Sequence, residues 1–478
     1  MKKHHLRPFL LIILLIIATG AAMAYSSAKS KPLFSNRIPS TPHRYPTKSG
    51  IVDISGHLVQ NKVLQGSDGT IHLSLTLRAD EVFDHDTADG RNVDMVIVMD
   101  RSGSMQGQKI EDARHAILNL LSALSEKDRF ALIAYSDGVR KYSDLLNVSA
   151  PNRKYLESVI SGIRAGGGTN LGAGLQEGIN TLLSAAQSGN VAKAILISDG
   201  LANKGITSPQ ELGNIAAIAV EKEFALSTVG VGADFNEYLM TAIADKGAGV
   251  YYYLENPSSF AEVFQQELYH TQATVATGVS VQIPLKDGVD LVHAAGYPIR
   301  IQNDNAVFYP GDLRSGQTRN LFLTLRVPSD KEREFEIGRI KVIYTHELRL
   351  HETALETSCK IACVKNRREV FSSIDKTSWT RKVIQEDFNK LKQEVARDIK
   401  SGKKQSALDR IQQYYREQES INTAVGSATV TENLDKDLTE LRNVVEDTFQ
   451  GAPAAVYEKQ KSNSKALQYE GYSGRRLQ

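Results

Sequence analysis

The sequence has very few cysteines: its 478 residues include two, Cys359 and Cys363. A disulfide framework of the kind that stabilises small secreted proteins is therefore excluded. From Leu355 to Cys363 apolar and polar residues largely alternate, which predicts a strand with both sulfur atoms on one face. Four residues of strand separate the two Cα atoms by roughly 13 Å, beyond the ~7 Å limit for a bridge. We expect two buried thiols, and a disulfide would require the strand to break there.

An excess of charge of one sign is also lacking. The chain has 57 Lys and Arg against 55 Asp and Glu, a formal net charge of +2. This balance gives no indication of nucleic-acid binding. The 13 Pro and 35 Gly are near or below average usage, which excludes collagen-like and low-complexity chains. A composition of 41% hydrophobic and 23% charged residues is typical of a globular protein, here long enough for about three domains.

A long hydrophobic run occurs only at the N-terminus. Residues 1–24 combine a cationic start, an apolar run from Pro8 and an Ala-Met-Ala sequence at 22–24. This pattern is typical of a secretory signal peptide, here cut before Tyr25. The run is a little shorter than the roughly 20 residues that a spanning helix needs. We expect an extracytoplasmic protein, periplasmic or secreted, with no membrane span in the mature chain; the alternative is an uncleaved N-terminal anchor.

The pattern of apolar residues changes several times along the chain. Residues 25–49 are rich in Ser, Pro, Lys and Arg and predict a flexible tether. Residues 50–91 contain two alternating runs around a Gly-Ser-Asp-Gly turn, which predicts a hairpin, and 271–366 contain further strand-like runs. Because a lone hairpin is marginal in water, we expect both regions to form one β-sandwich, interrupted by residues 92–270. The sequence DHDTADG near residue 84 is similar to an EF-hand loop, but Ala88 and Asp89 do not fit it, and we interpret it as an acidic surface loop.

Residues 92–270 instead predict an α/β domain with a doubly wound, mostly parallel sheet. Short apolar runs without alternation, as at 94–100 and 192–198, are typical of strands buried on both faces. Apolar residues at helical spacing lie between them, as at 108–125. Strands that alternate with helices form a parallel sheet whose ligands bind at the carboxyl ends of the strands.

The C-terminal part changes to a helical period. Residues 378–450 predict amphipathic helices that form a small bundle or cover the sandwich. Residues 451–478 lose the apolar pattern and carry five Lys and Arg residues between tyrosines. We interpret them as a disordered basic tail; the alternative is a basic, aromatic docking peptide.

Five side chains with oxygen atoms lie at the expected ends of the strands in the α/β domain. Asp100, Ser102 and Ser104 follow the first buried strand, Thr169 follows three glycines, and Asp199 follows the strand at 192–198. Carboxylates and hydroxyls are the ligands that Mg²⁺ requires, although Mn²⁺ and Ca²⁺ share this preference. Two carboxylates and three neutral hydroxyls do not saturate the coordination and charge of the ion, so an open position should remain.

The spacing Asp-x-Ser-x-Ser, with a later Thr and Asp, resembles the metal-ion-dependent adhesion site (MIDAS) of von Willebrand factor type A domains. The resemblance covers residues 92 to about 270. It implies that Ser102, Ser104 and Thr169 contact the metal, that Asp100 and Asp199 act directly or through water, and that a Glu or Asp of a protein partner completes the coordination. The wider layout resembles bacterial proteins described as calcium-activated chloride channel homologues, and more distantly inter-alpha-trypsin inhibitor heavy chains.

Two features beside this motif have alternative interpretations. The three glycines 166–168 let the backbone approach the ion or partner, or they form a flexible loop. Arg101 steers an acidic partner, or it is an ordinary exposed arginine.

The sequence contains no phosphate-binding loop, no His-Glu-x-x-His motif and no Gly-x-Ser-x-Gly nucleophile motif. We therefore do not expect an enzyme. The resemblance implies instead a bacterial, extracytoplasmic protein-binding or adhesion module that depends on a divalent cation. The alternatives are a structural scaffold, in which residues 92–270 are a spacer and the sandwich or helices bind the partner, and a hydrolase with an unrecognised site. The partner's identity, the oligomeric state and the biological process do not follow from the sequence.

Overall fold

The computed structural model describes residues 50–82, 90–186, 189–356 and 358–476. The expected signal peptide, tether and acidic loop near residue 84 lie outside these ranges. None of the described helices is long and apolar enough to cross a membrane.

The α/β domain is built on a seven-stranded sheet with strand order β10-β9-β8-β4-β5-β6, and β7 also pairs with β5. Its strands are β4 (Val93–Asp100), β5 (Arg129–Tyr135), β6 (Val139–Lys141), β7 (Leu146–Asn147), β8 (Val191–Ser198), β9 (Ala225–Val231) and β10 (Ala248–Leu254). Its helices are α2 (Gln108–Ala123), α3 (Ala150–Gly162), α4 (Leu171–Ala185), α5 (Pro209–Glu221), α6 (Glu237–Lys246) and α7 (Phe260–Gln272), with short 3-10 turns η1 (Gly103–Met105) and η2 (Pro257–Ser259). All pairs are parallel except those of β6 and β7 with β5.

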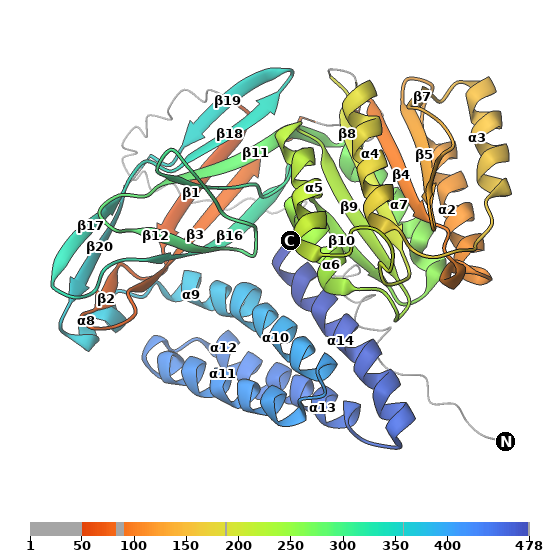
Figure 1. Ribbon diagram of the computed structural model, residues 1–478. Helices are drawn as coiled ribbons and strands as arrows, with labels where there is room; N and C mark the ends of the chain where they lie inside the picture. The colour runs from red at the N-terminus through yellow and green to blue at the C-terminus, as the bar shows by residue number, and fades with distance from the viewer. Residues whose placement is uncertain (1–49, 83–89, 187–188, 357, 477–478) are drawn as a thin grey trace, which may run out of the picture. The chain divides into compact units, whose positions relative to one another are not determined.

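Helices cover both faces of this sheet (Figure 1). Alternate residues of β4 belong to opposite cores: Met95 and Ile97 pack with α2, α3 and α7, whereas Val96 and Val98 pack with α4, α5 and α6. This explains the unbroken apolar run in the sequence, because every residue of the strand is buried.

The β-sandwich combines strands from both sides of the inserted domain. Its sheets have the orders β1-β3-β16-β12, β13-β14-β11-β18-β19 and β17-β20-β2, with β15 paired to β11. The strands are β1 (Val52–Leu58), β2 (Lys62–Leu64), β3 (Thr70–Ala79), β11 (Thr274–Pro284), β12 (Asp290–Ala294), β13 (Arg300–Gln302), β14 (Asn305–Phe308), β15 (Leu313–Arg314), β16 (Thr318–Arg326), β17 (Arg333–Ile337), β18 (Lys341–His346), β19 (Arg349–Ala354) and β20 (Cys359–Val364). Strand β3 pairs with β16, so that Leu73 lies opposite Leu323.

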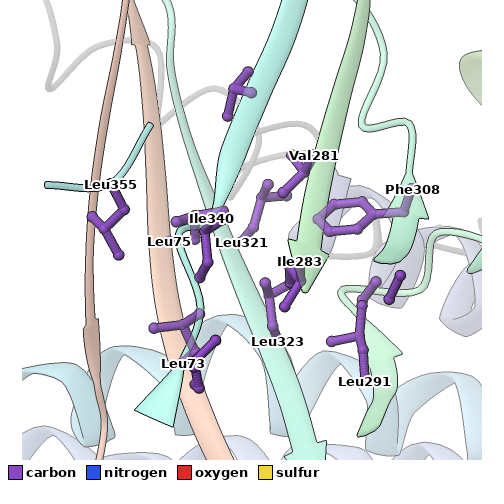
Figure 2. Close-up of a cluster of buried hydrophobic side chains, with 14 of the residues drawn as sticks. Leu73, Leu75, Val281, Ile283, Leu291, Phe308, Leu321, Leu323, Ile340 and Leu355 are labelled. Atoms are coloured by element: carbon purple, nitrogen blue, oxygen red, sulfur yellow. The ribbon is translucent and has the colours of Figure 1, made fainter. Parts of the chain in front are cut away.

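The sheets of the sandwich share one apolar core. Figure 2 shows Leu73 of β3, Leu323 of β16, Ile283 of β11 and Phe308 of β14 in this cluster, and all four are fully buried. The predicted α/β fold inserted in a sandwich and followed by helices is therefore confirmed.

The strands of the predicted hairpin at residues 50–91 do not pair in the way that the sequence pattern predicts. Strand β1 pairs with β3, but β2 leaves this sheet and pairs in parallel with β20. The same strand β20 carries Cys359 and Cys363, which are buried free thiols as predicted.

The C-terminal region consists of helices around a core of its own. They are α8 (Arg367–Ser372), α9 (Lys376–Lys382), α10 (Phe388–Lys400), α11 (Lys404–Val425), α12 (Ala428–Glu432), α13 (Leu438–Thr448) and α14 (Pro453–Arg476), with π-helical turns η3 (Val383–Asp387) and η4 (Asn433–Asp437). Helices α10 and α14 lie side by side (Figure 1).

The prediction of a disordered tail over residues 451–478 is wrong, because Pro453–Arg476 form the helix α14. Its buried face includes Ser464, Leu467, Gln468, Gly471 and Tyr472, which have helical spacing but include only two large apolar side chains. Small and polar residues on this face concealed the period from the sequence pattern.

Candidate functional site

The two aspartates of the motif lie side by side at one edge of the α/β sheet. Asp100 is the last residue of β4, and Asp199 directly follows β8, the neighbouring parallel strand. Both side chains are fully buried. Strand β4 has β5 on one side and β8 on the other, so this edge is the point where the strand order reverses. Ligands of open α/β sheets bind at this position.

The two serines connect the ends of these strands. The Ser102 backbone N–H donates to Oδ1 of Asp100 at 2.7 Å, which fixes the turn after β4. The hydroxyl oxygens of Ser102 and Ser104 are 3.1 Å apart, and Ser104 Oγ donates to Oδ1 of Asp199 at 2.7 Å. Four of the five predicted residues are thus joined by hydrogen bonds.

Thr169 comes to the same place from the loop before α4. This loop contacts the turn after β4 through a 2.9 Å hydrogen bond from Gly103 N–H to the carbonyl oxygen of Gly167. A Cβ atom at Gly200 would lie 3.2 Å from Ser104 Oγ and 3.6 Å from Thr169 Oγ1, so both hydroxyls lie beside Gly200. The structure therefore brings all five predicted positions together, while their role as metal ligands stays a prediction.

The glycines before Thr169 bring their loop against the turn of the motif. Gly166 N–H donates to the carbonyl oxygen of Arg101 at 2.7 Å. Gly167 has φ +87°, and a Cβ atom there would lie 2.5 Å from Oδ2 of Asp137. Both facts favour glycine at this position. Arg101 is half-buried rather than exposed, and its Nε is buried without a partner among the described residues.

Two residues of the site were missed by the sequence analysis. Lys109 Nζ donates to Oδ2 of Asp199 at 2.6 Å, and Ser198 Oγ donates to Oδ2 of Asp100 at 2.9 Å. Lys109 lies in the first turn of α2, and nothing in the sequence distinguishes it from a surface lysine. For Ser198, the only sequence signal is its position directly before Asp199.

The chemistry of this oxygen set fits a hard divalent cation. Burial, with a smaller contribution from the charge of Asp199, raises the pKa of Asp100 to about 6, although hydrogen bonds from Ser102 and Ser198 favour its ionised form. Burial makes the ionised carboxylate of Asp100 less stable, and a nearby cation would offset this cost. No group of three or more His, Cys, Asp or Glu side chains in the described part of the chain could hold a metal, and the present set has only two carboxylates beside its hydroxyls.

The comparison with protein families supports the resemblance of this region to von Willebrand factor type A domains. Residues 94–266 match the family model described as von Willebrand factor type A domain. The chain contains a von Willebrand factor type A (VWA) domain. Such domains commonly bind a divalent metal and generally mediate protein–protein interaction. The VWA domain of this chain therefore indicates a protein-interaction or adhesion module.

Relatives of the chain occur in bacteria and animals. The protein YfbK of Escherichia coli (strain K12) is 29% identical over 246 residues, which are 50% of this chain and 42% of YfbK. Inter-alpha-trypsin inhibitor heavy chain H4 of Homo sapiens is 30% identical over 196 residues, 40% of this chain and 21% of that protein. The chain spans less than half of the length of these two relatives.

The likeness to solved structures extends beyond the VWA domain. A von Willebrand factor type A protein from Catenulispora acidiphila is 17% identical and superposes with a TM-score of 0.65 over 90% of this chain and 98% of that one. The ArnB paralog VWA2 from Sulfolobus acidocaldarius is 16% identical, with a TM-score of 0.56 over 89% of this chain and 99% of that one. At this identity the likeness concerns the fold alone.

Proposed function

We propose that the VWA domain captures an acidic side chain of a protein partner through a divalent cation. The observation that carries this proposal is the cluster of five oxygen-bearing side chains at the reversal point of the sheet. Ser102, Ser104 and Thr169 would contact the ion, and Asp100 and Asp199 would neutralise it. Mg²⁺ is the proposed ion, and Mn²⁺ and Ca²⁺ have the same ligand preference.

Electrostatics explains why binding of an acidic partner should require the cation. A carboxylate that approaches Asp100 and Asp199 to within about 4–6 Å is repelled by each with ~3–4 kcal/mol at an effective dielectric constant near 20. The ammonium group of Lys109 pairs with Asp199 and offsets only one of these charges. A divalent cation adds two positive charges and converts the repulsion into attraction.

We also propose that the protein acts outside the cytoplasm and as a binding protein rather than an enzyme. The signal-like sequence at residues 1–24 supports the location. The absence of recognised catalytic motifs from the sequence supports a binding role. Assays of the pure protein on peptide, ester and glycoside substrates test the second point.

Affinity capture from the cell-envelope fraction tests the proposed function. The wild-type protein should retain its partner in Mg²⁺ and release it in EDTA. Thr169→Ala removes one of the proposed ligand hydroxyls and should abolish capture in Mg²⁺ without loss of folding, which circular dichroism checks. Thr207→Ala is the matched control, because Thr207 is exposed on the loop after Asp199. Undiminished capture by Thr169→Ala, or by the wild-type protein in EDTA, would refute the proposal.

A further inference from the structure

A cavity of about 180 Å³ lies at the edge of the VWA sheet opposite to the candidate metal site. Val191, Ala225 and Ala248, the first residues of β8, β9 and β10, line it, whereas the candidate metal site lies where β4 and β8 end. The other walls come from the sandwich, at Asp312 and Arg314, and from helix α14. The cavity is therefore distinct from the candidate metal site and lies where three parts of the chain meet.

The lining of this cavity is rich in positive charge. Four cationic side chains contribute to it: Lys193, Arg314, Arg319 and Arg476. Lys193 pairs with the buried carboxylate of Glu267, which also lines the cavity. Arg476 pairs with Asp245 at 2.8 Å. In the described ranges no ion pair involves Arg314 or Arg319, so these two guanidinium groups distinguish the cavity from an ordinary buried ion-pair network.

In the described part of the chain, a single N–H of the Arg319 guanidinium group is left without a partner. Its Nη1 donates to the carbonyl oxygens of Pro310 and Gly311, the latter at 2.8 Å, and its Nη2 donates to the carbonyl oxygen of Asp312 at 2.9 Å and to Oε1 of Gln317 at 3.4 Å. Its Nε is buried and has no partner among the described residues. An unpaired buried donor is costly, and an anion would remove this cost.

The neighbouring groups leave a surplus of positive charge at pH 7. Burial and the charge of Arg319 lower the pKa of Arg314, although the carboxylate of Glu267 acts in the opposite direction. Burial lowers the pKa of His270 to about 4, so this ring is neutral. Burial raises the pKa of Asp312 to about 6, which leaves it mostly ionised. Four cationic side chains thus line the cavity with the carboxylates of Glu267 and Asp312, and Asp245 outside the lining pairs with Arg476.

We propose that this cavity binds a small organic anion whose carboxylate or phosphate group is recognised by the guanidinium fork of Arg314 and by the unpaired Nε–H of Arg319. The planar fork of an arginine matches both kinds of oxyanion. Val250 and Tyr297 supply apolar surface for a carbon skeleton. The volume is below the roughly 300–1,000 Å³ of pockets for drug-sized ligands, which favours a small metabolite. Because the cavity has walls from all three parts, the anion should stabilise their association.

Thermal unfolding and calorimetry of the full chain test this proposal. The probes are succinate, glycerol phosphate and inorganic phosphate, each at constant ionic strength and in a buffer without other oxyanions. The protein is first treated with EDTA to remove divalent cations, and the EDTA is then removed by gel filtration. At least one probe should raise the melting temperature and bind with one site per chain. Succinate alone would identify a carboxylate ligand; glycerol phosphate or inorganic phosphate without succinate would identify a phosphate ligand.

Substitution of Arg314 shows whether binding occurs in this cavity. Arg314→Gln should weaken binding at least tenfold, and Arg314→Lys, which keeps the charge but loses the fork, should have an intermediate affinity. Without anion, Arg314→Gln should unfold at or above the wild-type temperature, because it removes a surplus charge. Arg326→Gln is the control, since Arg326 is exposed on β16 and loses the same charge. The proposal is overturned if none of the probes binds, or if Arg314→Gln binds as tightly as the wild-type protein.

Discussion

The hydroxyl of Tyr472 connects helix α14 to the VWA domain, and its removal should destabilise the protein measurably. Tyr472 is 3% exposed, and its oxygen accepts a hydrogen bond from the backbone N–H of Tyr251 at 3.0 Å. Tyr251 belongs to β10, the edge strand of the sheet, whose outer backbone groups have no further strand to pair with. Tyr472→Phe keeps the ring but leaves this buried N–H unpaired. We expect the free energy of unfolding to fall by about 1–3 kcal/mol.

Two further variants separate the hydroxyl from the ring. The rings of Tyr472 and Tyr251 pack edge to face, with centroids 5.5 Å apart. Tyr472→Ala removes this packing as well, and should cost about 3–5 kcal/mol, more than Tyr472→Phe. The ring of Tyr469 also packs on that of Tyr251, with centroids 5.8 Å apart. The hydroxyl of Tyr469, however, takes part in none of the hydrogen bonds of the described residues. Tyr469→Phe should therefore stay within about 0.5 kcal/mol of the wild-type protein.

Urea unfolding measures these differences, provided that the dependence on urea concentration is the same for all variants. Hydrogen exchange supplies a local measurement, in which the amide of Tyr251 should exchange faster in Tyr472→Phe than in Tyr469→Phe. Wild-type stability and exchange in Tyr472→Phe would refute the reasoning.

Two other predictions concern buried charge. Lys465→Met leaves the fully buried carboxylate of Glu237 with Lys400 as its remaining partner, and should lower the free energy of unfolding by about 2–4 kcal/mol. The exposed pair of Lys459 is the control, and equal effects of Lys465→Met and Lys459→Met in urea would contradict this expectation. Burial lowers the pKa of His293 to about 3, below its value in the unfolded chain. As the pH falls, the unfolded state therefore binds a proton before the folded state does. The free energy of unfolding should decrease as the pH falls from about 6.5 toward 3. Because the side chain of His293 is 30% exposed, we expect the free energy of unfolding to fall by about 1–3 kcal/mol over this pH range. His293→Gln should reduce this fall. The same pH profile of stability in the wild-type protein and in His293→Gln would contradict the prediction.

The arrangement of the candidate site could be predicted because each part follows a clear local signal. Asp100 and Asp199 each stand at the end of an unbroken apolar run, and such runs form parallel strands whose carboxyl ends share one edge. Their adjacency then follows from the order of the strands. The pairing of Lys109 with Asp199 could not be predicted, because it depends on where a flexible side chain of α2 reaches in the folded domain.

The formation of helix α14 could not be predicted from apolar spacing for a related reason. Lys465 reads as solvated in the sequence, but in the fold it is 4% exposed and pairs with Glu237, which lies far away in the chain. Gly471 gives no apolar signal, yet it lets α14 approach α10 so closely that a Cβ atom would lie 2.4 Å from the carbonyl oxygen of Asn389. Strand β2 illustrates the same limit, because its choice of β20 over β3 depends on a partner distant in sequence.

Direct titration of a divalent cation tests the central claim, that the oxygen atoms at the ends of β4 and β8 form one metal site. Mn²⁺ added to EDTA-treated protein can be followed by electron paramagnetic resonance, and Mg²⁺ can then compete for the site. We predict one Mn²⁺ per chain in the wild-type protein and in Thr207→Ala, displacement by Mg²⁺, and strongly weakened binding in Thr169→Ala and Ser104→Ala. Absence of Mn²⁺ binding to the wild-type protein, or binding that neither substitution weakens, would contradict the account.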